Sequence, residues 1–240
     1  MNVTPMQLQS VAKDIWVVSK DHRFIGVNLG ARMTIIRLEN GELILYSPVT
    51  MTDEIKKRVA DLGRVAHIVA PNLFHHLYAT AWADAYPDAT VYGAAGLQKK
   101  SPKLRLTARF SNETMAPWSG QVGHHTVKGM PALAETVLFH RSSRTLICAD
   151  LIFHISEPKG LWTSVYLKMA GVSKRAGVSR LVKIATKDKG AAGESVRTIL
   201  SWDFDRIIMA HGEILQQDGK AILRDSYRWL TRLLPSQVGF

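Results

Sequence analysis

Short apolar runs separated by turn residues predict strands and helices in the first half of the chain. Residues 15–19 and 32–38 are apolar enough for strands. The turn residues "ENGE" join the second run to "LILY", so these two runs predict a β-hairpin. Apolar residues then recur at helical spacing, and Thr50 or Thr52 can cap this helix while Gly63 ends it.

The rest of the chain alternates short apolar runs, which predict strands, with longer segments that predict helices. Residues 99–129 are rich in turn residues and allow no assignment. In each half, strands come first and helices then alternate with strands, which predicts two packed sheets with helices outside. The fold class is therefore α/β. Further strands are predicted at residues 65–70, 90–94, 135–140, 144–150 and 205–210, and helices at residues 78–86, about 160–202 and 218–234.

Composition places the chain among globular proteins. It has 240 residues, of which 46% are hydrophobic and 21% charged, and we expect a single domain over residues 1–240. No apolar run approaches the roughly 18 residues of a membrane helix. The N-terminus lacks the apolar core of a signal peptide, and Cys148 is the only cysteine, so a cytoplasmic location is the expectation.

The formal net charge of +11 suits anionic partners without choosing among them. A basic helical insert at about residues 160–189 concentrates this charge and also carries bulky apolar residues. It could be a lid over a site, a membrane-surface element or a partner helix, although a solvated face is the commoner role of a charge run. Asp188 is the single acid against eight bases, which are Lys159, Lys168, Lys174, Arg175, Arg180, Lys183, Lys187 and Lys189.

Three apolar strands end at residues that can bind a metal ion. The run "HIVAPN" precedes His75 and His76, "TLICAD" ends at Asp150, and "RIIMAH" ends at His211. In layered α/β folds, sites gather at the carboxyl ends of strands. Imidazoles and a carboxylate are a ligand set for zinc or iron.

The adjacent histidines cannot both point the same way from a strand, because neighbouring side chains face opposite sides. They could share one ion only at a turn, which Pro71 and Asn72 favour. We expect one of His75 and His76 to be a ligand and the other to face a substrate or support the site.

Four segments, "RMTIIRLENGELILYSPV", "HIVAPNLFHHL", "HRSSRTLICADLIF" and "WDFDRIIMAHGE", carry a resemblance to a known family. Over essentially its whole length the chain resembles the metallo-β-lactamase-like superfamily. It is most similar to an uncharacterised bacterial family within it, a domain of unknown function with no established reaction. The resemblance implies a four-layer αβ/βα sandwich in a single domain.

The superfamily's metal motifs are only partly present. Where His-x-His-x-Asp-His is expected, this chain has "PNLFHH", and the later ligand histidine is missing near Met130. Asp150 matches the bridging aspartate and His211 the last histidine. The resemblance therefore implies at most one metal ion, held by His75 or His76 with Asp150 and His211.

Other polar residues have less specific interpretations. Glu135 could supply a carboxylate in place of the missing histidine, or be a solvated strand end. Asn72 could bind a substrate, orient His76 or cap the following helix. Arg32 is expected in a structural ion pair. A second pair of histidines, His124 and His125, is expected at the surface of a Gly-rich loop.

The leading hypothesis is a metal-dependent hydrolase with one Zn, or Fe or Mn, and with Asn72 and Glu135 as candidate catalytic residues. Its substrate would be a small molecule, and esters, lactones, phosphodiesters and thioesters all remain open. One alternative is a metal-free, non-catalytic ligand-binding member of the fold. A second is a nucleic-acid binding or processing protein, which the charge allows but no motif supports. The oligomeric state is left open.

Overall fold

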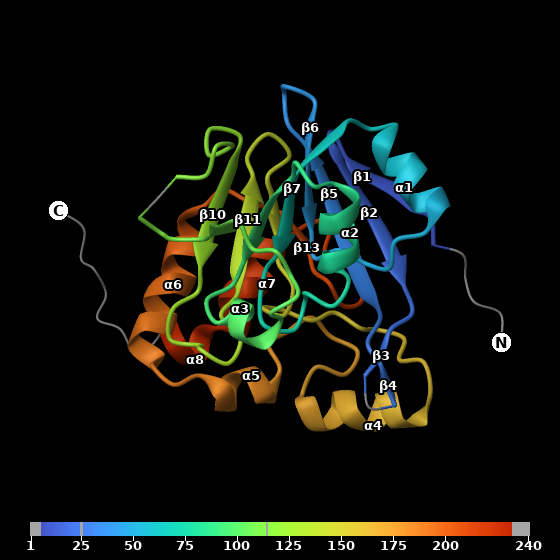
Figure 1. Cartoon of the computed structure of the whole chain (residues 1–240). Coiled ribbons are helices and arrows are strands. Elements are labelled where there is room, and N and C mark those ends of the chain that lie inside the picture. Colours follow the sequence, from blue (N-terminus) through green and yellow to red (C-terminus); the bar gives the residue numbers. More distant parts are fainter. Residues whose placement is uncertain (1–5, 25, 114, 232–240) are drawn as a thin grey trace.

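The computed structural model describes residues 6–24, 26–113 and 115–231. Two sheets lie face to face at the centre of the molecule (Figure 1). The larger sheet has the strand order β1-β2-β5-β6-β7-β8-β9, and the smaller has the order β10-β11-β12-β13. The strands of the larger sheet are β1 (Leu8–Ala12), β2 (Ile15–Lys20), β5 (Ala31–Arg37), β6 (Glu42–Tyr46), β7 (Arg64–Ala70), β8 (Thr90–Gly93) and β9 (Ala108–Arg109).

The smaller sheet mixes strand directions. β11 pairs with both β10 and β12 in antiparallel fashion, whereas β13 runs parallel to β12. A separate two-stranded hairpin is formed by β3 (Arg23–Phe24) and β4 (Val27–Asn28). The strands of the smaller sheet are β10 (Val122–Thr126), β11 (Thr136–His140), β12 (Thr145–Ile147) and β13 (Arg206–Ile208).

Helices cover the outer face of each sheet. On the larger sheet are α1 (Asp53–Ala60) and α2 (Ala79–Ala85), followed in the chain by α3 (Leu97–Lys100). On the smaller sheet are α6 (Lys189–Ser201), α7 (Gly219–Ser226) and α8 (Arg228–Thr231). The insert contributes α4 (Leu161–Ala170) and α5 (Arg180–Ala185), which lie along the lower edge in Figure 1.

Alternation along the strands divides the apolar residues into three layers. In β5, Met33 and Ile35 pack towards α1 and α2, whereas Ile36 enters the core between the sheets. In β11, Phe139 packs towards α6 and Leu138 enters the central core. A core outside each sheet and one between the sheets make a four-layer αβ/βα sandwich, so the predicted fold class is confirmed.

Most of the predicted local structure is present. The two hairpins occur as β5–β6 and β11–β12, and the Thr52 side chain caps α1. The long helix predicted at about residues 160–202 is instead three helices, because Gly171 ends α4 in the left-handed conformation. The C-terminal helix breaks at Tyr227, and residues 232–234 of that prediction lie outside the described residues.

The expectation of a surface loop for His124 and His125 was wrong. Both lie in β10, paired with Leu138 and Val137 of β11, and both are half-buried. The adjacent histidines interrupt the apolar pattern, but the edge of β11 supplies the hydrogen bonds that make this segment a strand. In the described part of the chain, no helix is both long and apolar enough to span a membrane.

Candidate metal centre

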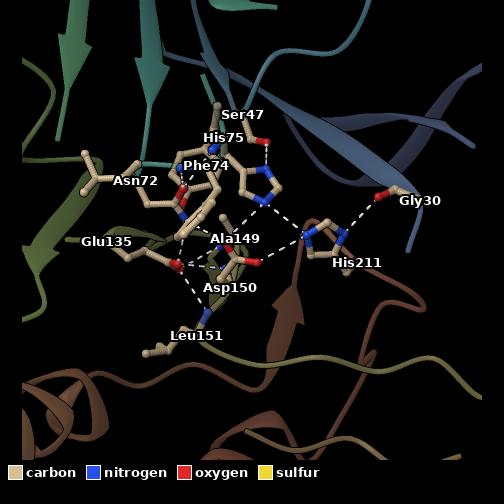
Figure 2. A network of polar contacts seen from close by, with 12 residues as sticks. Gly30, Ser47, Asn72, Phe74, His75, Glu135, Ala149, Asp150, Leu151 and His211 are labelled. Carbon is tan, nitrogen blue, oxygen red and sulfur yellow. Dashed lines mark hydrogen bonds and ion pairs between the residues drawn. The ribbon is translucent and has the colours of Figure 1, made fainter. Parts of the chain in front are cut away.

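The carboxyl ends of β7, β12 and β13 meet where the two sheets face each other. β7 belongs to the larger sheet, and its end leads through Pro71 into the turn that carries His75. β12 and β13 are parallel neighbours in the smaller sheet, and Asp150 and His211 follow them. Figure 2 shows the three side chains converging from these separate strand ends. The prediction that strand-end residues gather is thus met by His75, Asp150 and His211.

The three side chains approach each other through the Nε2 atoms of the two histidines and the carboxylate oxygens of Asp150. The Nε2 atoms of His75 and His211 are 3.1 Å apart. His75 Nε2 lies 3.4 Å from Asp150 Oδ2, and His211 Nε2 lies 3.2 Å from Asp150 Oδ1. Each residue therefore offers one potential ligand atom, and these three atoms all lie within 4.8 Å of one another.

The other ring nitrogen of each histidine has its own partner. His211 Nδ1 donates to the carbonyl oxygen of Gly30 at 2.9 Å, and a carbonyl can only accept. In the neutral His211 ring, Nε2 therefore carries a lone pair directed at His75 and Asp150. His75 Nδ1 lies 2.8 Å from the Ser47 hydroxyl. Such contacts on the far nitrogen fix ring orientation and are typical of metal-binding histidines.

Asn72 builds the turn that separates His75 from its neighbour. The Asn72 Oδ1 atom accepts hydrogen bonds from the backbone N–H groups of Phe74 and His75, both at 2.8 Å. Its Nδ2 atom donates to Asp150 at 2.8 Å and to Glu135 at 3.1 Å. Asn72 is fully buried. Its contacts connect the turn after β7 with Glu135 and Asp150 of the other sheet, and they orient His75 rather than His76.

Glu135 is also fully buried, contrary to its interpretation as a solvated strand end. Its carboxylate accepts hydrogen bonds from the backbone N–H groups of Ala149, Asp150 and Leu151 at 2.8, 2.7 and 3.3 Å (Figure 2). These bonds hold the backbone that carries Asp150. Glu135 therefore sits behind the group of three, away from solvent.

The two carboxyl groups have opposite pKa shifts. Burial raises the pKa of Glu135 to about 7, with a further contribution from the negative charge of Asp150. Burial would also raise the pKa of Asp150, but the adjacent imidazoles of His75 and His211 outweigh it and lower that pKa below its usual range. Asp150 is thus the anionic group at the centre, as a cation site requires.

His76 is not a member of this group. It is half-buried, and its carbonyl accepts the N–H of Ala79 at 3.0 Å at the start of α2. Burial lowers the pKa of its imidazole, with smaller contributions from the positive charges of Lys100 and His75. Met130, near which the later ligand histidine was expected, is buried in the core of the smaller sheet.

Arg32 is not in the ion pair that we expected. Its guanidinium donates to the carbonyl oxygens of Met209 and Gly212, at 2.8 and 2.6 Å, on either side of His211. Burial lowers the pKa of Arg32 to about 10. This side chain holds the loop that presents His211, and it lines a pocket that also includes Gly30 and Gly212.

Sequence reasoning missed several residues around the centre. Ser47 follows the end of β6, the same kind of position as the residues that were predicted. The Phe153 ring stacks on His211 with centroids 5.4 Å apart. Tyr78 contacts Lys20 Nζ at 3.2 Å and His22 Nδ1 at 3.3 Å through its hydroxyl. Of these residues, only Ser47 could have been predicted from the sequence, because it follows the end of a strand.

The fold has close counterparts among solved structures. A metallo-β-lactamase from Pontibacter korlensis is 13% identical with a TM-score of 0.66, covering 94% of this chain and 99% of that one. One from Hirschia baltica is 12% identical with a TM-score of 0.66, covering 95% and 98%. The metallo-β-lactamase FIM-1 from Pseudomonas aeruginosa, in a mono-zinc form, is 12% identical with a TM-score of 0.66, covering 97% and 98%.

At these identities the likeness shows the fold alone. No curated protein matches the chain in sequence. Residues 12–161, more than half of the chain, match the family model described as "Domain of unknown function (DUF4336)". The chain therefore belongs to this family of unknown function, and its fold is the one seen in metallo-β-lactamases.

Proposed function

We propose that this protein is a metal-dependent hydrolase whose single metal ion is held by His75, Asp150 and His211. The observation that carries the proposal is the convergence of two imidazole Nε2 atoms on one carboxylate, while both Nδ1 atoms are engaged elsewhere. His76 is not included as a ligand, because it does not join that group.

The donor set fits a cation of zinc size. Ligand atoms bound at about 2.0–2.1 Å in a tetrahedral site are about 3.3 Å from one another. The two Nε2 atoms are 3.1 Å apart, and each lies near a different carboxylate oxygen of Asp150, at 3.2 Å for His211 and Oδ1 and at 3.4 Å for His75 and Oδ2. Without a cation or a shared proton, the lone pairs of two neutral Nε2 atoms would face each other beside an anion, which is unfavourable. A divalent ion bound there would supply Lewis-acid chemistry, polarising a substrate oxygen and making water acidic near neutral pH.

The surrounding residues would position the centre and the substrate. Asn72 and Glu135 hold the Asp150 carboxylate and its backbone, so their roles are in positioning and not in contact with a substrate. Lys20, His22 and Tyr78 form a polar cluster, in which burial and the positive charge of Lys20 lower the pKa of His22. We propose that this cluster binds a polar group of a small-molecule substrate.

A cytoplasmic location of the protein stays a prediction.

The test is hydrolysis by zinc-loaded and chelator-treated protein of four chromogenic substrate classes, namely carboxyl esters, lactones, phosphodiesters and thioesters. We expect metal-dependent turnover of at least one class, reduced by roughly 100-fold or more in Asp150→Ala and His211→Ala. His124→Ala is the matched control and should retain activity, because His124 lies in β10 and bonds to the Ser111 carbonyl. Turnover that survives Asp150→Ala would contradict the proposal. Zinc binding without turnover of any class would favour the ligand-binding alternative.

A further inference from the structure

Exposed apolar side chains gather on the two helices of the insert. In the described part of the chain, nine large hydrophobic residues are exposed, and six of them lie on α4 and α5. Their exposed fractions range from 39% to 79%. We call this surface the α4–α5 face, defined by Leu161, Trp162, Val165 and Met169 on α4 and Leu181 and Ile184 on α5.

Helical spacing separates this face from the side of α4 that packs on the protein. The exposed residues Leu161, Trp162, Val165 and Met169 are spaced as one stripe of a helix. The buried residues Thr163, Leu167 and Ala170 form the opposite stripe, and the Thr163 hydroxyl accepts the N–H of Asn28 at 3.0 Å. The helix is therefore anchored from behind, and its outward stripe is free to meet a partner.

The two helices contact each other. Arg180 Nη1, at the start of α5, donates to the carbonyl oxygen of Met169 near the end of α4 at 3.3 Å. The Ser179 side chain caps α5, which buries none of its own residues. Figure 1 shows both helices at the same edge of the molecule. The exposed apolar residues of both helices therefore lie at this edge.

Basic residues are frequent in the segment that carries the apolar ones. Between residues 159 and 189 the only acid is Asp188, and its carboxylate accepts the N–H of Ala191 at 2.9 Å to cap α6. Asp188 thus offsets only one of the eight bases in this segment. The exposed bases nearest the α4–α5 face in the chain are Lys168, Lys174, Arg175, Arg180, Lys183 and Lys187.

The charge of this surface selects among possible occupants. A second copy of the chain would bring an equally basic surface against it, and like charges at an interface are repulsive. Separate apolar side chains on an outward ridge, with interleaved lysines and a tryptophan, are the features of helices that lie in a membrane interface. We propose that the α4–α5 face docks this protein on an anionic phospholipid bilayer, with the apolar stripe entering the headgroup region and the bases contacting the phosphates.

The test is co-sedimentation of the full-length protein with vesicles of phosphatidylcholine alone and of phosphatidylcholine mixed with phosphatidylserine. We expect binding to the mixed vesicles, weaker binding to the neutral ones, and release as salt is raised. Trp162→Ser combined with Met169→Ser should weaken binding at least tenfold. Removing one base should weaken binding to the mixed vesicles roughly fivefold. The double variant Lys183→Glu with Lys187→Glu should weaken it further, because it reverses two charges.

Matched controls separate the face from general attraction by a positively charged protein. Met115→Ser removes an equally exposed methionine elsewhere, and Lys57→Glu reverses an exposed base on α1. Both should bind as the unmutated protein does, and thermal melting by circular dichroism verifies that every variant is folded. Equal losses in face and control variants, or no binding to mixed vesicles, would overturn the proposal. Light scattering that shows a dimer lost in the Trp162 variant would also overturn it, in favour of self-association. None of these outcomes depends on a bound metal or on catalysis.

Discussion

At the scale of single residues, the candidate centre depends on how two adjacent histidines are separated. The Asn72 side chain accepts two successive backbone N–H groups and thereby turns the chain after β7. That turn directs His75 to Asp150 and His211, while His76 begins the approach to α2. A buried asparagine with all its contacts inside the protein therefore decides which imidazole takes part.

Ser47 should position His75 without contacting an ion itself. Its hydroxyl is buried and lies 2.8 Å from His75 Nδ1. We expect Ser47→Ala to weaken zinc binding by about 10–100-fold, because the ring loses its orienting partner. Competition with a chromogenic chelator measures this affinity. Ser201→Ala, which removes a hydroxyl from the exposed end of α6, is the control, and equal affinities in both variants would refute the role of Ser47.

His125 should make stability depend on pH. Burial, with the positive charges of His124 and Lys128, lowers the pKa of His125 from 6.5 to about 4, and its Nε2 has no hydrogen-bond partner among the described residues. The unfolded chain then binds a proton between pH 6.5 and 4 that the folded chain does not, so stability is full above pH 6.5 and falls towards pH 4.

We expect His125→Asn to reduce this acid-induced loss by about 1–2 kcal/mol, less than the full shift implies because solvent screens a partly exposed ring. Urea unfolding of both proteins in metal-free buffer at several pH values measures the difference. Near pH 8 the free energy of unfolding should change with pH to the same extent in both proteins. Parallel loss of stability on acidification would show that His125 does not contribute.

At the scale of elements, the centre is a meeting of three strand ends. β7 is held between β6 and β8, and β12 is held between β11 and β13, so the residues that follow them start from fixed positions. The loop after β13 needs additional support. Arg32 supplies it from the neighbouring sheet by binding carbonyl oxygens on both sides of His211.

Gly212 should be essential to that loop. It has a φ of +84°, and a Cβ there would lie 1.7 Å from the carbonyl oxygen of His154. We expect Gly212→Ala to destabilise the protein by about 2–4 kcal/mol and to displace His211. Urea unfolding gives the stability, and zinc titration gives the effect on the centre. Gly120→Ala is the matched control, because nothing lies within 4 Å of its added Cβ, and similar losses in both variants would contradict this account.

The sequence was informative wherever a short-range pattern determines structure. Apolar runs predicted β7 and β13, turn residues predicted the hairpins, and Thr52 was among the predicted caps of α1. β10 was missed because its hydrogen bonds come from β11, and its own histidines interrupt the apolar pattern. Strand formation there is decided by a partner and not by the segment itself.

The supporting residues of the candidate centre could not be predicted for a related reason. Glu135 is buried because three backbone N–H groups after β12 surround it, and a sequence does not show where backbone donors point. The partners of Arg32 are carbonyl oxygens distant in the chain. Strand-end position indicated Asp150, His211 and one of His75 and His76, since it depends only on the order of elements, but it did not choose between the two histidines.

At the scale of the whole molecule, the two sheets share one central core. Residues from β5, β6 and β7 pack there with residues from β11, β12 and β13. The Tyr46 hydroxyl also donates to the carbonyl oxygen of Thr136 across the two sheets at 2.9 Å. Neither sheet can lose this layer without exposing the other.

The single domain over residues 1–240 remains a prediction that unfolding can test. Because the central core is shared, we expect one cooperative transition in urea, with coincident midpoints by circular dichroism and by tryptophan fluorescence. The fluorescence signal draws on both halves, since Trp82 is buried behind the larger sheet and Trp202 packs on the smaller one. Two separated transitions would show that the halves are independent units.

The central claim is that one ion is held by His75, Asp150 and His211, and titration calorimetry of the chelator-treated protein with Zn²⁺ near neutral pH tests it most directly. We predict binding of one ion per chain, abolished in His75→Ala, Asp150→Ala and His211→Ala and retained in the controls His76→Ala and His124→Ala. Binding should weaken on acidification, because imidazole ligands must be unprotonated. Failure of the unmutated protein to bind Zn²⁺, Mn²⁺ or Fe²⁺ would contradict the account, as would binding that requires His76 but not His75.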